Sequence, residues 1–244
     1  GPPQGTPVAN TMQGTAGDDL YYVDHRDDKI VEALDSGVDT VYVFSQALAA
    51  LPYYQMPANI ENGRILGSIG MSLWGNELAN ILYAGDGDDN IIGSYGDPSN
   101  DTVSYQYAKS AVTLNLTFDS YAPEVTGGSG KDDLLYIDNA IGSGYNDTMT
   151  GNAMANILDG SSGADRMAGG NGDDTYVVEN PGDVVVETLN AGIDTVNSWL
   201  LGYTLTDNVE NARILQLGKT WLTGNVLDNV IYASQDSNVI DGAG

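Results

Sequence analysis

Hydrophobic and polar residues recur along part of the chain with a period of nine. From Gly142, four consecutive segments read GSGYNDTMT, GNAMANILD, GSSGADRMA and GGNGDDTYV. Each begins with Gly, carries Asp or Asn at its sixth position and has an apolar residue at its eighth. The segments AGDGDDNII (84–92) and GGSGKDDLL (127–135) follow the same pattern. A unit of nine is too short for a helical repeat, and it predicts a six-residue turn followed by a three-residue strand with one inward side chain.

Repetition of this unit predicts a solenoid. Two units complete one coil with a turn on each side, and successive coils stack as parallel strands. The eighth-position side chains then form the core, here Met149, Leu158, Met167 and Tyr176. Helix caps are scarce and Gly interrupts almost every window, which disfavours helices. The predicted fold class is an all-β parallel solenoid.

A longer repeat encloses the short one. Residues 14–43 and 169–198 align without gaps and match at 14 of 30 positions. The matched pairs include Gly17/Gly172, Asp19/Asp174, Asp28/Asp183, Glu32/Glu187 and Asp39/Asp194. The similarity continues in NIENGRIL (59–66) and NVENARIL (208–215), and again in GNELANILYA (75–84) and GNVLDNVIYA (224–233). The first copy has extra residues around LPYYQMPA (51–58), so the pattern indicates a decorated duplication.

These repeats predict two blocks, residues 11–102 and 127–244, joined by a connecting β segment at 103–126. That segment contains VSYQYAKSAVTLNLTF, which alternates like strands and lacks Gly-Asp turns. Both one continuous roll and two separate rolls fit this pattern. We interpret residues 1–10 as a linker that begins with a tag scar, Gly1-Pro2. The chain stops at VIDGAG, inside a repeat-like unit, and we therefore interpret it as part of a longer protein.

The charge balance narrows the possible partners. Lys and Arg number 8 against 34 Asp and Glu, a formal net charge of −26. Such a field repels nucleic acid and anionic lipid and attracts cations. The absence of Cys excludes disulfides, thiolate metal sites and a Cys nucleophile. No stretch is long and apolar enough to span a bilayer, and no secretory signal opens the chain.

Stacking of the coils suggests what the acidic residues do. Units two apart lie on the same edge, which predicts one column of Asp147, Asp165 and Asp183 and another of Asn156, Asp174 and Asp194. Carboxylates spaced by about 4.8 Å repel unless a hard divalent cation lies between successive turns. Calcium accepts six to eight oxygens from carboxylates and backbone carbonyls. Glycines would reach positive φ and turn carbonyls inward without a Cβ clash.

The repeated unit G-G-x-G-x-D-x-U-x resembles the signature of the RTX (repeats-in-toxin, haemolysin-type) calcium-binding family. The resemblance covers most of the chain. It implies a right-handed parallel β-roll that binds several calcium ions through sixth-position carboxylates and turn carbonyls and folds on binding them. It also implies an extracellular or cell-surface protein, exported by type I secretion without a cleaved N-terminal signal.

Carried over by position, the resemblance implies a set of metal ligands. The closest matches are Asp19, Asp39, Asp89, Asp132, Asp165, Asp174 and Asp194, with turn glycines Gly17, Gly87, Gly130, Gly163 and Gly172. Asp28, Asp101, Asp147 and Asp183 fit the pattern less closely. Three turns depart from it, with Leu78, Met154 and Leu227 in place of Gly and with Asn80, Asn156 and Asn229 at the sixth position. We expect these to be calcium-free turns or half-sites with a different backbone conformation.

Other chemistry has little support. His25 lies in VDHRDDK, a predicted exposed turn, and nothing completes a Ser-His-Asp arrangement around it. With 34 acidic residues, carboxylate pairs arise by chance, so no glycosidase pair is inferred. The adjacent Tyr53 and Tyr54 either stack on a sugar or protein partner or pack over the solenoid itself. We therefore expect a chain without catalytic residues.

The predicted function is a calcium-binding module of a secreted bacterial protein. A strongly acidic, Gly-rich chain stays expanded at the low calcium concentration of the cytosol, and external calcium then stabilises the folded form. It would act as a structural module that presents neighbouring domains. One alternative is a calcium-dependent adhesin or S-layer-like module that binds polysaccharide through Tyr53 and Tyr54. Another is the non-catalytic part of an extracellular polysaccharide-modifying enzyme or protease.

Overall fold

The computed structural model describes residues 7–34, 37–48, 53–94, 100–117 and 125–243. It divides the chain into two compact units. Unit 1 takes the described residues up to Ala108 and those from Val125 to Ile137, and unit 2 takes Lys109–Thr117 and the chain from Asp138 onwards. The predicted tag scar Gly1-Pro2 lies outside the described residues, as does most of the predicted linker.

Unit 1 is built almost entirely from short strands. They are β1 (Thr11–Gln13), β2 (Leu20–Val23), β3 (Lys29–Val31), β4 (Thr40–Phe44), β5 (Tyr54–Gln55), β6 (Asn62–Leu66), β7 (Ser72–Trp74), β8 (Ile81–Tyr83), β9 (Asn90–Ile92), β10 (Thr102–Ser104), β12 (Val125–Gly127) and β13 (Gly130–Leu135). One short helix, α1 (Ser45–Leu48), follows β4. Among the described residues, no helix has the length and hydrophobicity that crossing a bilayer would need.

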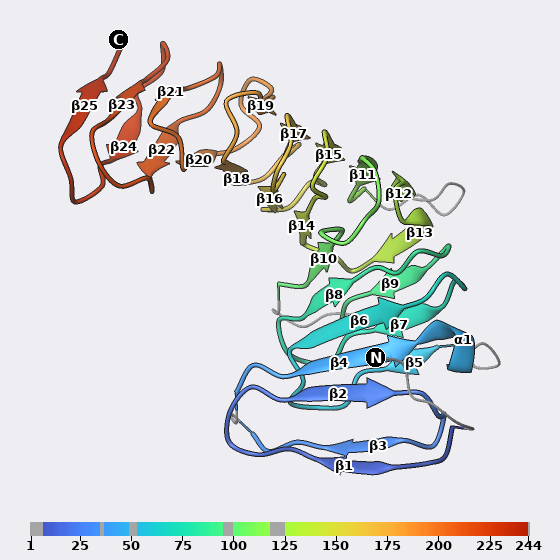
Figure 1. The fold of residues 1–244 in the computed structure, drawn as a ribbon. Coiled ribbons are helices and arrows are strands. Elements are labelled where there is room, and N and C mark those ends of the chain that lie inside the picture. Colours follow the sequence, from blue (N-terminus) through green and yellow to red (C-terminus); the bar gives the residue numbers. More distant parts are fainter. Residues whose placement is uncertain (1–6, 35–36, 49–52, 95–99, 118–124, 244) are drawn as a thin grey trace. The chain divides into compact units, whose positions relative to one another are not determined.

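These strands form two sheets whose members alternate along the chain. The first has the order β2-β4-β6-β8-β10 and is parallel throughout. The second runs β5-β7-β9-β13 in parallel, and β12 joins β13 antiparallel. β1 and β3 pair separately. Figure 1 shows β2, β4, β6 and β8 side by side in chain order, the arrangement of a solenoid wall.

Unit 2 repeats this plan. Its strands are β11 (Val112–Asn115), β14 (Asn139–Ile141), β15 (Thr148–Thr150), β16 (Ile157–Asp159), β17 (Arg166–Ala168), β18 (Thr175–Val178), β19 (Val184–Val185), β20 (Thr195–Ser198), β21 (Gly202–Thr204), β22 (Asn211–Ile214), β23 (Thr220–Thr223), β24 (Val230–Tyr232) and β25 (Asn238–Asp241). One wall has the order β14-β16-β18-β20-β22-β24 and the other β11-β15-β17-β19, with β21-β23-β25 as a third parallel sheet.

The nine-residue period produces the core as predicted. Met149 pairs in register with Leu114 and Met167 on one wall, and Leu158 pairs with Tyr176 on the other. All five side chains are fully or almost fully buried. Burial of one apolar side chain contributes roughly 1.5–3 kcal/mol for each strand, and each coil has two such strands. The prediction of an all-β parallel solenoid is confirmed.

The predicted connecting segment, 103–126, supplies strands to both units. β10 pairs with β8 in unit 1, and β11 pairs with β15 in unit 2. β12 begins at its end and belongs to unit 1. Residues 118–124 of this segment lie outside the described part of the chain. The predicted block boundaries therefore stay predictions.

Candidate metal centres

Sixth-position side chains of unit 2 form two hydrogen-bonded columns. On one edge the backbone N–H of Asp147 donates to Oδ1 of Asp165 at 2.7 Å, and the N–H of Asp165 donates to Oδ1 of Asp183 at 3.1 Å. On the other, the N–H of Asn156 donates to Oδ1 of Asp174 at 2.7 Å. The N–H of Asp174 in turn donates to Oδ1 of Asp194 at 2.9 Å. Each carboxylate thus holds the start of a strand in the preceding coil, which explains why Asp occupies a buried position.

Unit 1 has corresponding columns. The N–H of Asp19 donates to Oδ1 of Asp39 at 2.8 Å, and the N–H of Asp39 donates to Oε2 of Glu61 at 2.7 Å. On the other edge, the N–H of Asp89 donates to Oδ1 of Asp132 at 2.8 Å. The columns of unit 2 therefore bring together the residues that the repeat pattern assigned to one edge, and unit 1 forms columns of the same kind that the pattern had not specified.

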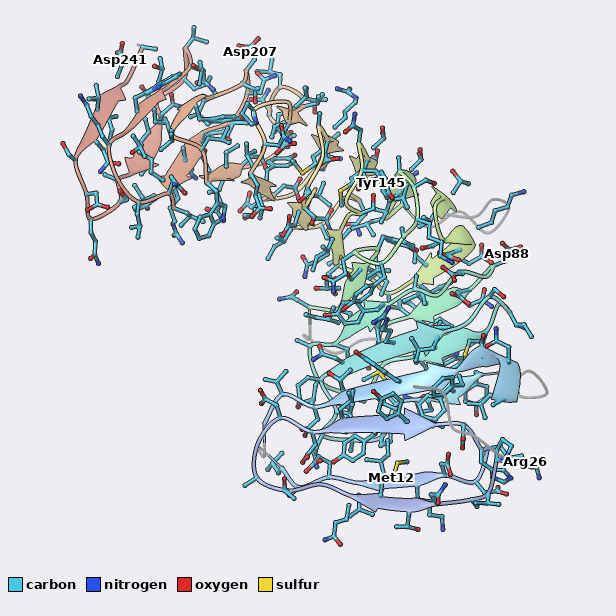
Figure 2. The ribbon with its side chains drawn as sticks, in the orientation of Figure 1. Met12, Arg26, Asp88, Tyr145, Asp207 and Asp241 are labelled. Carbon is cyan, nitrogen blue, oxygen red and sulfur yellow. The ribbon has the colours of Figure 1, made fainter. Side chains whose placement is uncertain are left out.

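Fifth-position side chains form bonds in the opposite direction. Oδ1 of Asp88 accepts from the N–H of Lys131 in the following coil at 2.9 Å, and Oδ1 of Asp173 accepts from the N–H of Ile193 at 2.9 Å. These side chains are exposed, and Figure 2 shows Asp88 projecting from the turn edge of unit 1. Because water solvates them, the fifth-position carboxylates do not need a cation.

Several sixth-position carboxylates are buried with an oxygen that accepts no hydrogen bond. These atoms are Oδ2 of Asp39, Asp165, Asp174 and Asp194. All four residues are at most 1% exposed. A buried carboxylate oxygen without a partner costs several kcal/mol unless a positive charge approaches it. The four oxygens therefore meet the chemical requirement of a cation ligand.

Burial shifts the acidity of these groups. Desolvation, followed by the charge of neighbouring carboxylates, raises the pKa of Asp165 to about 6 and that of Asp174 to about 7. The same causes raise the pKa of Asp132 to about 8, where the hydroxyl of Tyr105 lies beside the carboxyl group. A nearby cation would favour the charged form and reverse these shifts.

The protein supplies little positive charge to balance the carboxylates. Arg26 lies 3.8 Å from Asp27, and Nδ1 of His25 lies 3.9 Å from the same carboxylate, on exposed or half-exposed side chains. Asp27 is not a sixth-position residue. Neither contact therefore compensates the buried carboxylates whose Oδ2 atoms have no hydrogen-bond partner, which are those of Asp39, Asp165, Asp174 and Asp194.

Glycine allows successive turns to approach closely. Gly17, Gly130, Gly163 and Gly172 all have positive φ. At Gly172, φ is 116° and an added Cβ would lie 2.5 Å from the carbonyl carbon of Met154 in the preceding coil. Gly87 differs from this expectation because its φ is not positive; an added Cβ there would lie 2.5 Å from the backbone nitrogen of Gly70. Gly87 is required for close approach of the two turns.

Other candidate carboxylates already have protein partners on both oxygens. Asp183 accepts from the N–H groups of Asp165, Glu179 and Asn180, and Asp28 accepts from those of Asn10, Asp24 and His25. Asp89, Asp101 and Asp147 likewise accept a backbone N–H on each oxygen. A cation at these five residues would share oxygens that already hold the backbone.

In the three turns with Asn at the sixth position, the side-chain amide donates hydrogen bonds to backbone carbonyls. Nδ2 of Asn80 donates to the carbonyls of Ile60 and Glu61 at 3.0 and 3.1 Å. Nδ2 of Asn156 donates to the carbonyl of Asp138 at 2.7 Å, and Nδ2 of Asn229 donates to that of Val209 at 3.1 Å. The amide nitrogen contacts carbonyls that would otherwise be available to a cation. Leu78, Met154 and Leu227 do not adopt positive φ, so these turns differ as expected from the four Gly turns that do.

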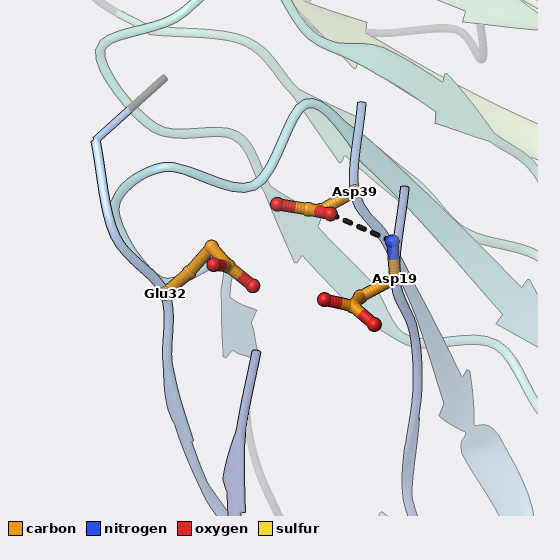
Figure 3. Close-up of side chains that lie close together, drawn as sticks. All are labelled: Asp19, Glu32 and Asp39. Atoms are coloured by element: carbon orange, nitrogen blue, oxygen red, sulfur yellow. Dashed lines mark hydrogen bonds between the residues drawn. The ribbon is translucent and has the colours of Figure 1, made fainter. Parts of the chain in front are cut away.

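Sequence reasoning missed four glutamates. Glu61 and Glu210 extend the columns, since Oε2 of Glu210 accepts from the N–H of Asp194 at 2.8 Å. Glu32 lies with Asp19 and Asp39, and Glu187 lies with Asp174 and Asp194, with one ligand oxygen from each residue within 4.8 Å of the others. Figure 3 shows the carboxylates of Asp19, Glu32 and Asp39 directed toward one another. The matching pair Glu32/Glu187 in the duplicated segment was the available signal.

The two tyrosines singled out in the sequence both line a cavity of about 620 Å³ in unit 1. Tyr53 is exposed and its ring lies 5.0 Å from that of Trp74, whereas Tyr54 is half-buried in β5. His25 is half-buried, and its Nδ1 accepts from the N–H of Asp27. This hydrogen bond links His25 to the turn in which it lies.

Comparison with known proteins agrees with this geometry. The model of the RTX calcium-binding nonapeptide repeat matches residues 74–104 and 141–176, in four copies. A curated relative, the endo-1,3-1,4-beta-glycanase ExsH of Rhizobium meliloti (strain 1021), is 38% identical over 81 residues. The match spans 33% of this chain and only 16% of that relative. Both units of the chain therefore carry RTX calcium-binding nonapeptide repeats of the haemolysin type, folded as a parallel β-solenoid.

Proposed function

We propose that this chain is a calcium-dependent structural module of a secreted bacterial protein. The observation that carries the proposal is the set of buried, unpartnered Oδ2 atoms of Asp39, Asp165, Asp174 and Asp194. Calcium is the cation that suits them, because it takes oxygen ligands in flexible geometry and is abundant outside cells. The sixth-position aspartates named above would supply the carboxylates. The backbone carbonyls of the glycine-containing turns would supply the remaining ligands.

Folding would follow calcium. Without a cation, a chain with a net charge of −26 repels itself, and its buried carboxylates must be protonated or left uncompensated. Calcium binds the folded form and stabilises it by mass action. An expanded chain in the calcium-poor cytosol suits export through a narrow type I channel, followed by folding outside. The folded module would then hold neighbouring domains in place.

A calcium titration followed by far-UV circular dichroism tests this proposal. Protein stripped with EDTA should gain β signal cooperatively with calcium and much less with magnesium. Asp165→Asn should raise the calcium concentration at the midpoint, whereas Asp88→Asn, which removes the same charge from an exposed fifth position, should not. A stripped protein that is fully folded and indifferent to calcium would contradict the proposal.

We also propose that the chain is the non-catalytic part of its parent protein. The relative that it resembles is named a glycanase, and the chain matches only 16% of that protein. The isolated chain should therefore show no turnover of β-glucans. Measured turnover that survives repurification would overturn this assignment.

A second candidate function is calcium-dependent polysaccharide binding. The contact between the rings of Tyr53 and Trp74 favours it, as does a cavity of about 750 Å³ lined by Trp74, Tyr136 and Glu77. Aromatic faces stack on sugar rings. Affinity electrophoresis in β-glucan gels should show retardation that calcium promotes and that Trp74→Ala abolishes. Equal mobility with and without glucan would remove this candidate.

A further inference from the structure

Two clusters of three carboxylates combine column residues with a glutamate from outside the nonapeptide pattern. Asp174 and Asp194 precede strands in adjacent coils, whereas Glu187 lies two residues after β19 on the opposite wall. Asp19, Glu32 and Asp39 repeat this arrangement in unit 1 (Figure 3). The nonapeptide pattern assigns no role to either glutamate.

Both glutamates are held in place by the same two contacts. The hydroxyl of Tyr176 donates to Oε1 of Glu187, and the N–H of Thr188 donates to Oε2 at 3.1 Å. In unit 1, the hydroxyl of Tyr21 donates to Oε2 of Glu32, and the N–H of Ala33 donates to Oε1 at 2.9 Å. A glutamate side chain that is free in solvent would not make these two hydrogen bonds. The contacts therefore indicate that each carboxylate is held in one position.

Both buried aspartates of this cluster carry an oxygen without a partner. Asp174 and Asp194 are 0% exposed, and Oδ2 of each accepts no hydrogen bond. Oδ2 of Asp174 lies beside the Tyr176 hydroxyl, since the two atoms are 2.0 and 2.5 Å from the position that a Cβ on Gly169 would take. The orphaned oxygen therefore faces the Tyr176–Glu187 pair.

Three carboxylates this close need a compensating charge. In unit 2 all three residues are buried, and no ion pair of the described chain involves them. Removing a carboxylate charge from water is unfavourable, and three carboxylates within 4.8 Å of one another add mutual repulsion. A hard divalent cation with oxygen ligands removes both penalties at once.

We propose that Asp174, Glu187 and Asp194 together bind one divalent cation, and that Asp19, Glu32 and Asp39 bind a second. The proposal rests on the proposed function and extends it, because it assigns two ions whose third carboxylate comes from outside the nonapeptide repeats. The unit 2 site binds more tightly, since its three ligands are buried. In unit 1, Asp19 and Glu32 are half-exposed, and Oδ2 of Asp19 already accepts from Thr15 at 2.7 Å.

The test counts bound calcium by equilibrium dialysis with elemental analysis, at a free calcium concentration that saturates the wild type. Glu187→Gln keeps an acceptor for Tyr176 and removes one charge, and it should lose one ion per chain. Glu32→Gln should lose another, and the double variant two. Glu179→Gln, which removes an exposed carboxylate of the same unit, should lose none.

The ion counts distinguish this proposal from the proposed function as a calcium-dependent module. If the wild type binds calcium and Glu187→Gln binds the same number of ions, this inference fails while the proposed function stands. If the wild type binds no calcium, the proposed function fails as well. Circular dichroism at saturating calcium checks that each variant folds.

Terbium luminescence tests the same site should Glu187→Gln fail to fold. Tyr176→Phe keeps all three carboxylates and removes only the hydroxyl beside the proposed ion. Tyrosine-sensitised terbium emission should fall relative to wild type, whereas Tyr232→Phe, on the exposed β24, should leave it unchanged. Equal emission from the two variants would overturn the assignment.

Discussion

The backbone N–H of Asp174 donates to Oδ1 of Asp194, twenty residues later, at 2.9 Å, while Oδ2 of Asp194 has no protein partner. One carboxylate therefore serves two purposes. Oδ1 holds the preceding coil by a charge-assisted hydrogen bond, and Oδ2 remains available to a cation. Substitution can separate these purposes.

Asp194→Asn should keep the hydrogen bond and lose the charge. In EDTA it should be at least as stable as wild type, because one repulsive charge is gone, but it should gain less stability from calcium. Asp194→Ala also orphans the N–H of Asp174 and should cost about 1–3 kcal/mol with or without calcium. Urea denaturation in calcium and in EDTA, with the same concentration of sucrose in every sample so that the calcium-free fold is populated, measures both effects. Equal stability of the two variants in EDTA would show that the bond contributes nothing.

The core positions that recur every nine residues could be predicted from the sequence. Met149 and Tyr176 are buried because an eighth-position residue always follows its turn at the same distance. Glu187 could not be predicted in the same way, because it lies outside the nonapeptides and no period of the sequence indicates that its carboxylate accepts from the hydroxyl of Tyr176. Sequence similarity paired Glu32 with Glu187, but it could not indicate that both point toward the turn.

Acidification should stabilise the calcium-free protein. Burial raises the pKa of Asp132 to about 8 and that of Asp174 to about 7, above the value of about 3.9 expected in the unfolded chain. The folded state therefore binds more protons than the unfolded state. The free energy of unfolding in EDTA should rise as pH falls from about 8 to about 5.

Urea midpoints across this pH range, at one fixed concentration of sucrose that populates the calcium-free fold, measure the effect. Asp132→Asn should flatten the slope at its upper end, whereas Asp133→Asn, at an exposed neighbouring position, should not. In saturating calcium the slope should shrink or reverse, because protons compete with the ion for the same oxygens. A calcium-free protein that loses stability on acidification would contradict the assigned pKa shifts.

Substitution of Gly172 should lower the stability of the folded protein. Its φ of 116° is unfavourable for any other residue, and an added Cβ would lie 2.5 Å from the backbone of Met154. Gly172→Ala should destabilise the calcium-bound protein by at least about 1 kcal/mol. Gly144→Ala is the matched control, because a Cβ there meets nothing within 4 Å. Thermal unfolding in calcium compares the two, and a similar small shift for both would show that the turn at Gly172 can relax.

At Asn156 a carboxylate can be added rather than removed. The side-chain amide of this residue already makes hydrogen bonds within the protein. Its Nδ2 donates to the carbonyl of Asp138 at 2.7 Å and to Oδ1 of Asn152 at 3.3 Å. Asn156→Asp replaces these donors with an oxygen that faces other oxygens. In EDTA this should cost about 1–3 kcal/mol or more, because the half-buried carbonyl of Asp138 loses this donor and a charge is placed at the buried position of Asn156.

Calcium should recover part of that loss, because the new carboxylate would join the edge that already carries Asp174 and Asp194. Asn146→Asp adds the same charge at an exposed fifth position, where Oδ1 still accepts from the N–H of Ala164, and it should change little. Urea denaturation of both variants with and without calcium, in the same concentration of sucrose so that the calcium-free wild type folds, decides the outcome. If Asn156→Asp is as stable as wild type in EDTA, the Asn amide does not replace a cation, and the difference between the two kinds of turn must lie in the backbone alone.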